Sequence, residues 1–175
     1  MFLLCTCLPI CFTLAKISCR LLIFLTEIPT PLGVYPLTKD TKGRDVSNKK
    51  NPPGTSTGVR YSPGTNGVPE KSTCFAGKPG SFMEFPKSKQ LDAKNEITIL
   101  FNIYPEKPGP ILEYYPGGIQ VWLLGRNTLF VRFVRRVRKA VRPLKARKLR
   151  RRQWNYVGVT YDQDSGTNFF SFLMK

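Results

Sequence analysis

Histidine is absent from this chain of 175 residues. Without an imidazole, Ser-His-Asp and Cys-His catalysis are excluded, as is every zinc site that requires a histidine ligand. Acidic residues are also scarce, because 11 Asp and Glu accompany 28 Lys and Arg, for a formal net charge of +17. An excess of one sign on this scale directs attention to partners of the opposite sign.

The positive charge is concentrated between Arg132 and Arg152. This local basicity predicts a surface for a polyanion, whether nucleic acid, sulfated glycan or anionic membrane. No aromatic residue lies between Phe133 and Trp154, so the segment has no platform for stacked bases, whereas arginine forks bind sulfates much as they bind phosphates. The segment is therefore either a solvated, charged strand and loop or a binding site, and a sulfated glycan or another extracellular polyanion is then favoured over nucleic acid or anionic membrane as its ligand. The candidate polyanion-binding residues are Arg132, Arg135, Arg136, Arg138, Lys139, Arg142, Lys145, Arg147, Lys148, Arg150, Arg151 and Arg152.

The first 29 residues are strongly apolar. Phe2–Ala15 carries no charge and has the length of a signal-peptide core, which is too short for a membrane-spanning helix, and Lys16 then interrupts it. We interpret 1–29 as a secretory signal peptide or a membrane-anchor-like segment, forming an apolar helix or leader; a misassigned start is the alternative. Four of the five cysteines lie here, as small apolar residues of this segment: Cys5, Cys7, Cys11 and Cys19. Removal of the segment would therefore leave Cys74 without a disulfide partner.

Residues 30–71 are rich in Gly, Pro, Ser, Thr, Asn and Lys and show no sustained periodicity. We expect an irregular arm that lies over a surface. From residue 72 onward the pattern changes to short runs bounded by Gly and Pro, about ten residues apart. Such spacing is typical of an antiparallel sandwich.

Period-two alternation is clearest in 96–106, where one face carries Ile97, Ile99, Phe101 and Ile103. The segments 127–134 and 153–162 alternate in the same way. The stretch 130–144 is ambiguous, because its apolar residues also recur at helical spacing with arginines on the other face. A strand with a loop and a basic amphipathic helix ended by Pro143 both fit it.

Several segments together resemble the concanavalin A-like lectin/glucanase superfamily, in particular its laminin G-like and pentraxin-like modules. They are Phe75–Phe85 with Gly77 and Ser81, Ile97–Pro105 (ITILFNIYP), Gly109–Tyr114 (GPILEY) and Trp154–Gly166 (WNYVGVTYDQDSG). The resemblance spans roughly residues 33–166. It implies an antiparallel jelly-roll sandwich over 72–175, incomplete at the C-terminus because further strands usually follow the last motif.

The same resemblance bears on the chemistry. Members of this superfamily mostly bind glycans or extracellular proteins, often with calcium. Trp122 and Trp154 are expected in the core, and stacking on sugar rings is the alternative. Asp162 and Asp164 are weak calcium candidates, because they match no complete calcium loop and the run DQDSG also suits a hairpin turn. The enzymatic branch requires carboxylates alternating along one strand, and no Glu-x-Asp-x-x-Glu run occurs here. We expect no enzyme activity.

The sequence thus predicts an extracellular or cell-surface recognition module for glycans, including sulfated glycans, or for matrix proteins. Two alternatives stay open. One is a protein that binds nucleic acid or anionic membrane through 132–152, and the other is a non-functional fragment of a longer lectin-like protein.

Overall fold

The computed structural model describes residues 2–5, 10–18, 30–92, 96–114, 118–133, 143–162 and 168–173. For 2–5, 10–18 and 168–173 it gives the backbone and its pairing alone. The regular structure of these residues consists of fourteen β-strands and one short 3-10 helix, η1 (Lys89–Leu91), so the predicted all-β class is confirmed. Within the same residues, no helix has the length and apolarity needed to cross a membrane.

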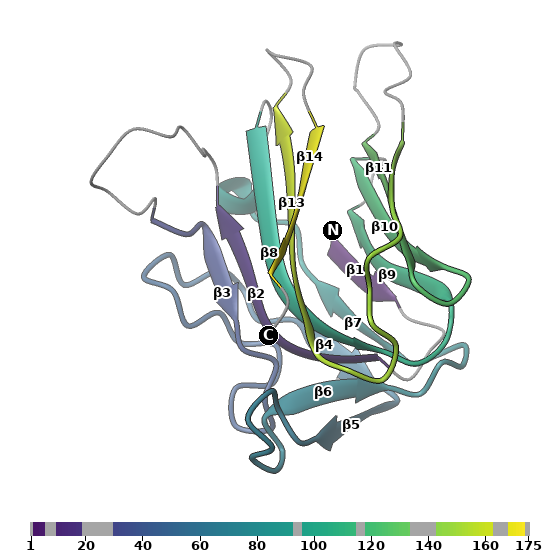
Figure 1. Ribbon diagram of the computed structural model, residues 1–175. Helices are drawn as coiled ribbons and strands as arrows, with labels where there is room; N and C mark the ends of the chain where they lie inside the picture. The colour runs from purple at the N-terminus through teal and green to yellow at the C-terminus, as the bar shows by residue number, and fades with distance from the viewer. Residues whose placement is uncertain are drawn as a thin grey trace.

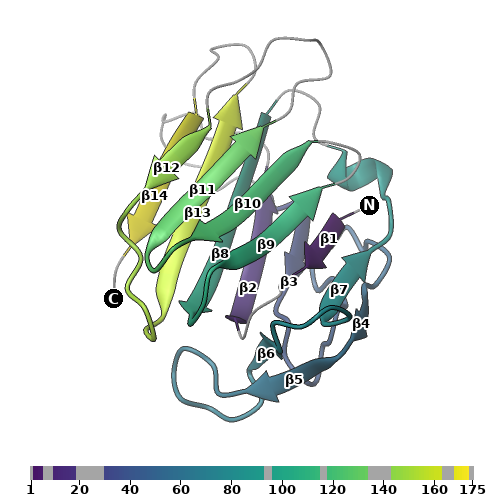
Figure 2. The ribbon, with the colours of Figure 1, turned by 90° about the vertical axis from the view of Figure 1, so that its right-hand side faces the viewer.

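The strands form two antiparallel sheets that face each other (Figure 1). Sheet A is seen face-on in Figure 2. Its order in space is β12 (Leu144–Ala146), β11 (Thr128–Phe133), β10 (Ile119–Leu124), β9 (Gly109–Tyr114), β1 (Phe2–Cys5), β7 (Phe82–Phe85) and β4 (Thr55–Thr57). Four of these strands, β9 to β12, follow one another in sequence as a meander.

Sheet B lies behind sheet A in Figure 2. Its order is β14 (Asn168–Leu173), β13 (Asn155–Asp162), β8 (Glu96–Pro105), β2 (Ile10–Ser18), β6 (Ser72–Phe75) and β5 (Val59–Ser62), with β3 (Gly33–Tyr35) also paired to β2. The chain passes from sheet B to sheet A between β8 and β9, and from sheet A back to sheet B between β12 and β13.

The apolar N-terminal segment supplies a strand to the interior of each sheet. The helix expected within 1–29 does not occur in the described part of it, because β1 pairs with both β9 and β7, and β2 pairs with both β8 and β6. An apolar segment must satisfy its backbone N–H and C=O groups wherever it is buried. Here strands on both edges provide those partners, so a ladder takes the place of a helix.

The two sheets share one apolar core. Period-two alternation positions its residues as predicted: Ile97, Ile99, Phe101 and Ile103 of β8 are all buried, and so are Leu129, Val131 and Phe133 of β11. Rings from the two sheets meet inside the core. Phe133 of sheet A stacks on Tyr161 of sheet B with ring centroids 4.5 Å apart. Each fully buried side chain of this size contributes about 1.5–3 kcal/mol to folding.

The ambiguous stretch 130–144 is strand wherever it is described. Phe130–Phe133 lies in β11 and Leu144 begins β12, while 134–142 lies outside the described residues. Near the C-terminus, β14 pairs with β13 over six residues at the edge of sheet B. The turn predicted at 163–166 also lies outside the described residues.

The segment 30–71 contains three short strands, β3, β4 and β5, and a buried carboxylate organises its first half. The Asp45 side chain, 7% exposed, accepts hydrogen bonds from the backbone N–H groups of Val34, Ser47 and Asn51 at 2.8–2.9 Å. The Ser47 hydroxyl and the Asn51 side-chain amide also donate to it. Asn51 extends the network by accepting a 2.8 Å bond from Ser88, the N-cap of η1.

These bonds fix the charge state of Asp45. Burial alone would raise the pKa of its carboxyl, but the backbone N–H donors and the Asn51 amide outweigh burial and hold the pKa below the usual 3.8. A carboxylate that accepts several hydrogen bonds is stabilised in its ionised form. The segment 30–51 is therefore held in place by the hydrogen bonds of an ionised carboxylate, that of Asp45.

Asp45→Asn should lower the free energy of unfolding by about 2–3 kcal/mol at neutral pH, because hydrogen bonds to a charged acceptor are lost or weakened. The folded-state pKa is depressed, so this contribution is present above the unfolded-state pKa near 3.8 and disappears as pH falls through the folded-state value. Urea unfolding between pH 2 and 7 should show a shallower acid limb for the variant. Asp40→Asn, at an exposed ion pair with Lys71, is the control and should change stability much less.

Tyr35 carries a different buried polar group. Its ring packs edge-on against Phe85 at 4.6 Å, and its buried hydroxyl has no hydrogen-bond partner among the described residues. Burial, and to a smaller extent the Asp45 carboxylate, raises the pKa of Tyr35.

Tyr35→Phe should leave stability unchanged or raise it by about 1–3 kcal/mol, because it removes a hydroxyl buried without a partner and keeps the ring. The thermal unfolding midpoint measures the change. Tyr156→Phe, at a half-buried position, is the control and should alter it little. A clear loss of stability in Tyr35→Phe alone would mean that the hydroxyl has a partner in solution.

Candidate polyanion-binding site

The predicted basic residues fall in two places in the fold. Arg132 on β11 and Lys145 on β12 are exposed on the outer face of sheet A. The others in the described part of the chain belong to the loop from β12 to β13: Arg147, Lys148, Arg150, Arg151 and Arg152. Five predicted residues lie outside the described residues: Arg135, Arg136, Arg138, Lys139 and Arg142.

An apolar anchor holds the loop between β12 and β13 against the core. Leu149 is only 3% exposed, and its backbone N–H donates to the Asn127 carbonyl in the turn between β10 and β11. The flanking Lys148 and Arg150 are exposed. Leu149 therefore points inward and the cations around it face solvent.

The buried side chain of Asn155, the first residue of β13, holds the backbone of this loop by hydrogen bonds. It is 3% exposed, and its side-chain oxygen accepts a 2.8 Å bond from the Arg150 backbone N–H. Its side-chain amide donates to the carbonyls of Arg150 and Gln153 at 2.9 and 2.8 Å. A buried amide that uses both its donor and its acceptor on the same loop holds that loop in one conformation.

Two arginines tie the loop to the turn between β8 and β9. The Arg151 side chain donates through Nε to the Glu106 carbonyl at 2.8 Å, and the Arg152 backbone N–H donates to the Pro105 carbonyl at 2.9 Å. Arg152 has a φ of +56°, in the left-handed region that costs a non-glycine residue about 1–2 kcal/mol. The surrounding hydrogen bonds retain this conformation.

Neighbouring turns add cations that sequence reasoning missed. Lys107 lies in the turn between β8 and β9, and Arg126 lies in the turn between β10 and β11; both are exposed. They are separated from the basic run along the chain. The three connections β8–β9, β10–β11 and β12–β13 nevertheless lie at one end of the fold, because the chain changes sheets after β8 and after β12. We call this cluster the basic end: Lys107, Arg126, Arg147, Lys148, Arg150, Arg151 and Arg152. The connections that carry these residues lie at the lower ends of β8 to β13 in Figure 2.

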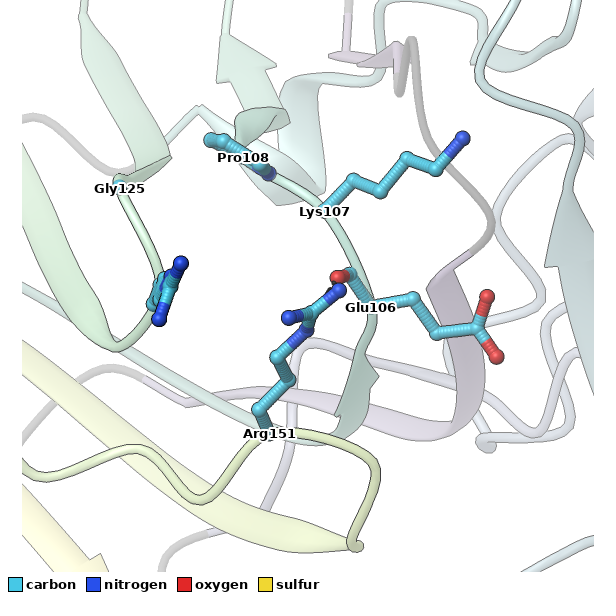
Figure 3. Close-up of a pocket in the computed structure, with 6 residues that line it drawn as sticks. Glu106, Lys107, Pro108, Gly125 and Arg151 are labelled. Atoms are coloured by element: carbon cyan, nitrogen blue, oxygen red, sulfur yellow. Dashed lines mark hydrogen bonds between the residues drawn. The ribbon is translucent and has the colours of Figure 1, made fainter.

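A pocket of about 250 Å³ opens at the basic end, between the three connections (Figure 3). Arg151, Arg126 and Lys107 line it together with Pro108 and Gly125, and the surface exposed inside the pocket is apolar. Glu106 is its acidic lining residue, and its carboxylate points away from the Arg151 guanidinium (Figure 3). The guanidinium NH₂ groups of Arg151 and Arg126 are suited to a tetrahedral oxyanion such as a sulfate.

Both tryptophans correct the expectation that they lie in the core. Trp122 is half-buried, because Val121 and Leu123 on either side fill the core and the alternation of β10 sends Trp122 to the outer face. Phe130 of β11 lies directly opposite it. Trp154 is also half-buried and packs edge-on against Tyr104 with ring centroids 5.6 Å apart, two residues beyond Arg152.

Of the two calcium candidates, only Asp162 lies in the described part of the chain. Asp162 ends β13 opposite Glu96, while Asp164 lies outside the described residues. No group of three or more His, Cys, Asp or Glu side chains that could hold a metal occurs among the residues described.

Comparison with protein-family models, with characterised proteins and with solved structures finds no match to this chain. What it binds must therefore be inferred from its own charge, burial and loop geometry.

Proposed function

We propose that this chain is a non-catalytic recognition module whose basic end binds a sulfated glycan. The observation that carries the proposal is the fixed loop Arg147–Arg152, whose backbone is held by Leu149 and Asn155 while its cations face solvent. A preorganised loop loses little conformational entropy on binding, so more of the electrostatic attraction appears as affinity.

The proposed fold is a laminin G-like jelly roll at the cell surface or outside the cell. Two of the segments that carry this resemblance, Ile97–Pro105 and Trp154–Gly166, contribute the neighbouring strands β8 and β13, which pair over eight residues. This pairing supports the proposal, because motifs far apart in sequence form adjacent interior strands of one sheet. Glycans and matrix proteins are the partners that such a module would recognise.

The geometry favours a sulfated glycan over nucleic acid. The basic end brings two arginines from separate connections, Arg126 and Arg151, to one small pocket, which suits discrete sulfates. Single-stranded nucleic acid would also need open aromatic faces for its bases. The nearest aromatic residue along the chain, Trp154, packs against Tyr104 rather than standing free.

The test uses heparin oligosaccharide and a pair of matched variants. Arg152→Asn removes one cation, and asparagine tolerates the left-handed backbone that position 152 requires. Lys50→Asn is the control, because Lys50 is also exposed with a positive φ, of 50°. Lys50 adjoins Asn51, which binds Ser88 just beyond β7. Because β7 and β9 run in the same direction on either side of β1, Ser88 lies at the end opposite to the basic end.

We expect the wild-type chain to remain bound to a heparin column above about 0.15 M NaCl. Arg152→Asn should weaken binding by about two- to fivefold and reduce the slope of log Kd against log[NaCl] by about one. Lys50→Asn should change neither quantity. Arg126→Gln combined with Arg152→Asn should weaken binding further.

Release of the wild-type chain below physiological salt would overturn the proposal, as would equal losses in Arg152→Asn and Lys50→Asn. Single-stranded DNA and phosphatidylserine vesicles serve as competitors in the same titration. Displacement of heparin by either of them at equal charge concentration would favour nucleic acid or membrane instead.

A further inference from the structure

Two cysteines that are far apart in sequence occupy directly opposite positions in sheet B. Cys11 on β2 is the Cα partner of Cys74 on β6, and the next pair in this antiparallel ladder is Phe12 with Thr73. Composition alone gives Cys11 no such role, because it lies in an apolar segment among three other cysteines. The pairing of β2 with β6 gives it a specific neighbour.

The register meets the backbone requirement for a disulfide. Directly opposite residues of an antiparallel pair have Cα atoms about 4.5 or 5.5 Å apart, depending on the hydrogen-bonding pattern. Disulfides in proteins join Cα atoms about 4.4–6.8 Å apart, so either pattern falls within the range. Cys5 provides an internal contrast, because its partner across β1 and β7 is Phe82.

We propose that Cys11 and Cys74 form a cross-strand disulfide under oxidising conditions. The oxidant is a low-molecular-weight disulfide such as oxidised glutathione. One cysteine thiolate attacks it, which forms a mixed disulfide and expels one glutathione thiolate. The second cysteine thiolate then attacks the protein sulfur of that mixed disulfide and expels the other. The two cysteines together lose two protons and two electrons, and the oxidant is reduced to two thiols.

This bond would reinforce the weakest junction of sheet B. The ladder between β2 and β6 contains two residue pairs, whereas seven pairs join β2 to β8. Strand β5 in turn pairs only with β6 in the described part of the sheet. The covalent link would thus hold β5 and β6 to the remainder of sheet B. Because it also closes a long loop of the unfolded chain, it belongs to the class of disulfides with a large stabilising effect.

The experiment is a peptide map of the folded, full-length chain. The protein is equilibrated in a glutathione redox buffer, alkylated and digested with trypsin without reduction. We expect the peptides 1–16 and 72–87 to appear joined, two hydrogens lighter than the sum of the separate peptides, with fragmentation assigning the link to Cys11. Reduction should separate them and lower the unfolding midpoint by about 5–15 °C.

Two variants make the outcome decisive. Cys5→Ser is the matched control within the same tryptic peptide and should retain the link and the reduction-sensitive midpoint. Cys11→Ser should abolish both, and its midpoint should equal that of the reduced wild-type chain. Complete alkylation of Cys74 in the folded, oxidised wild-type chain would overturn the proposal, and so would a link from Cys74 to Cys5, Cys7 or Cys19. None of these results depends on heparin binding, so this inference and the proposed function fail separately.

Discussion

The packing of two sheets on one apolar core is the constraint on which the rest of this structure depends. The strands that line this core bury alternate side chains, as Val121 and Leu123 do in β10, so the intervening positions face outward. The connections between strands must lie at the ends of the sheets. Charged residues are therefore confined to the outer faces and the connections, and the basic run can contribute to a surface only at those places.

The interior also determines the shape of the basic end. Leu149 enters the core from the loop, and Asn155 enters it from the first position of β13 and satisfies the loop backbone. Without such partners a loop with this many cations would spread by mutual repulsion. The same interactions that stabilise the fold thus position Arg150 and Arg151 for a ligand, which connects core packing directly to the proposed binding.

Local periodicity was sufficient to predict the all-β class and the buried face of β8, because strand parity depends on neighbouring residues alone. The same parity directs Trp122 outward, whereas the expectation that it lies in the core rested on the family resemblance. Local periodicity carries no information about contacts between residues far apart in the sequence. The role of Asp45 depends on Asn51 and Ser88, and the joining of Lys107 and Arg126 to the basic end depends on two crossings between sheets. A single sequence carries no local signal for either arrangement.

Repulsion among the cations of the basic end favours the binding of an anionic partner. Seven cations lie there in the described part of the chain, and Glu106 is the acidic residue among those that line the pocket, in a chain whose net charge is +17. Such self-repulsion destabilises the compact state. The left-handed backbone at Arg152 adds a local cost. A polyanion that binds only the folded arrangement would offset both by mass action, because a ligand selective for the native state raises its stability. Recognition and stability at this end of the molecule would then rise together with ligand concentration and fall together with salt.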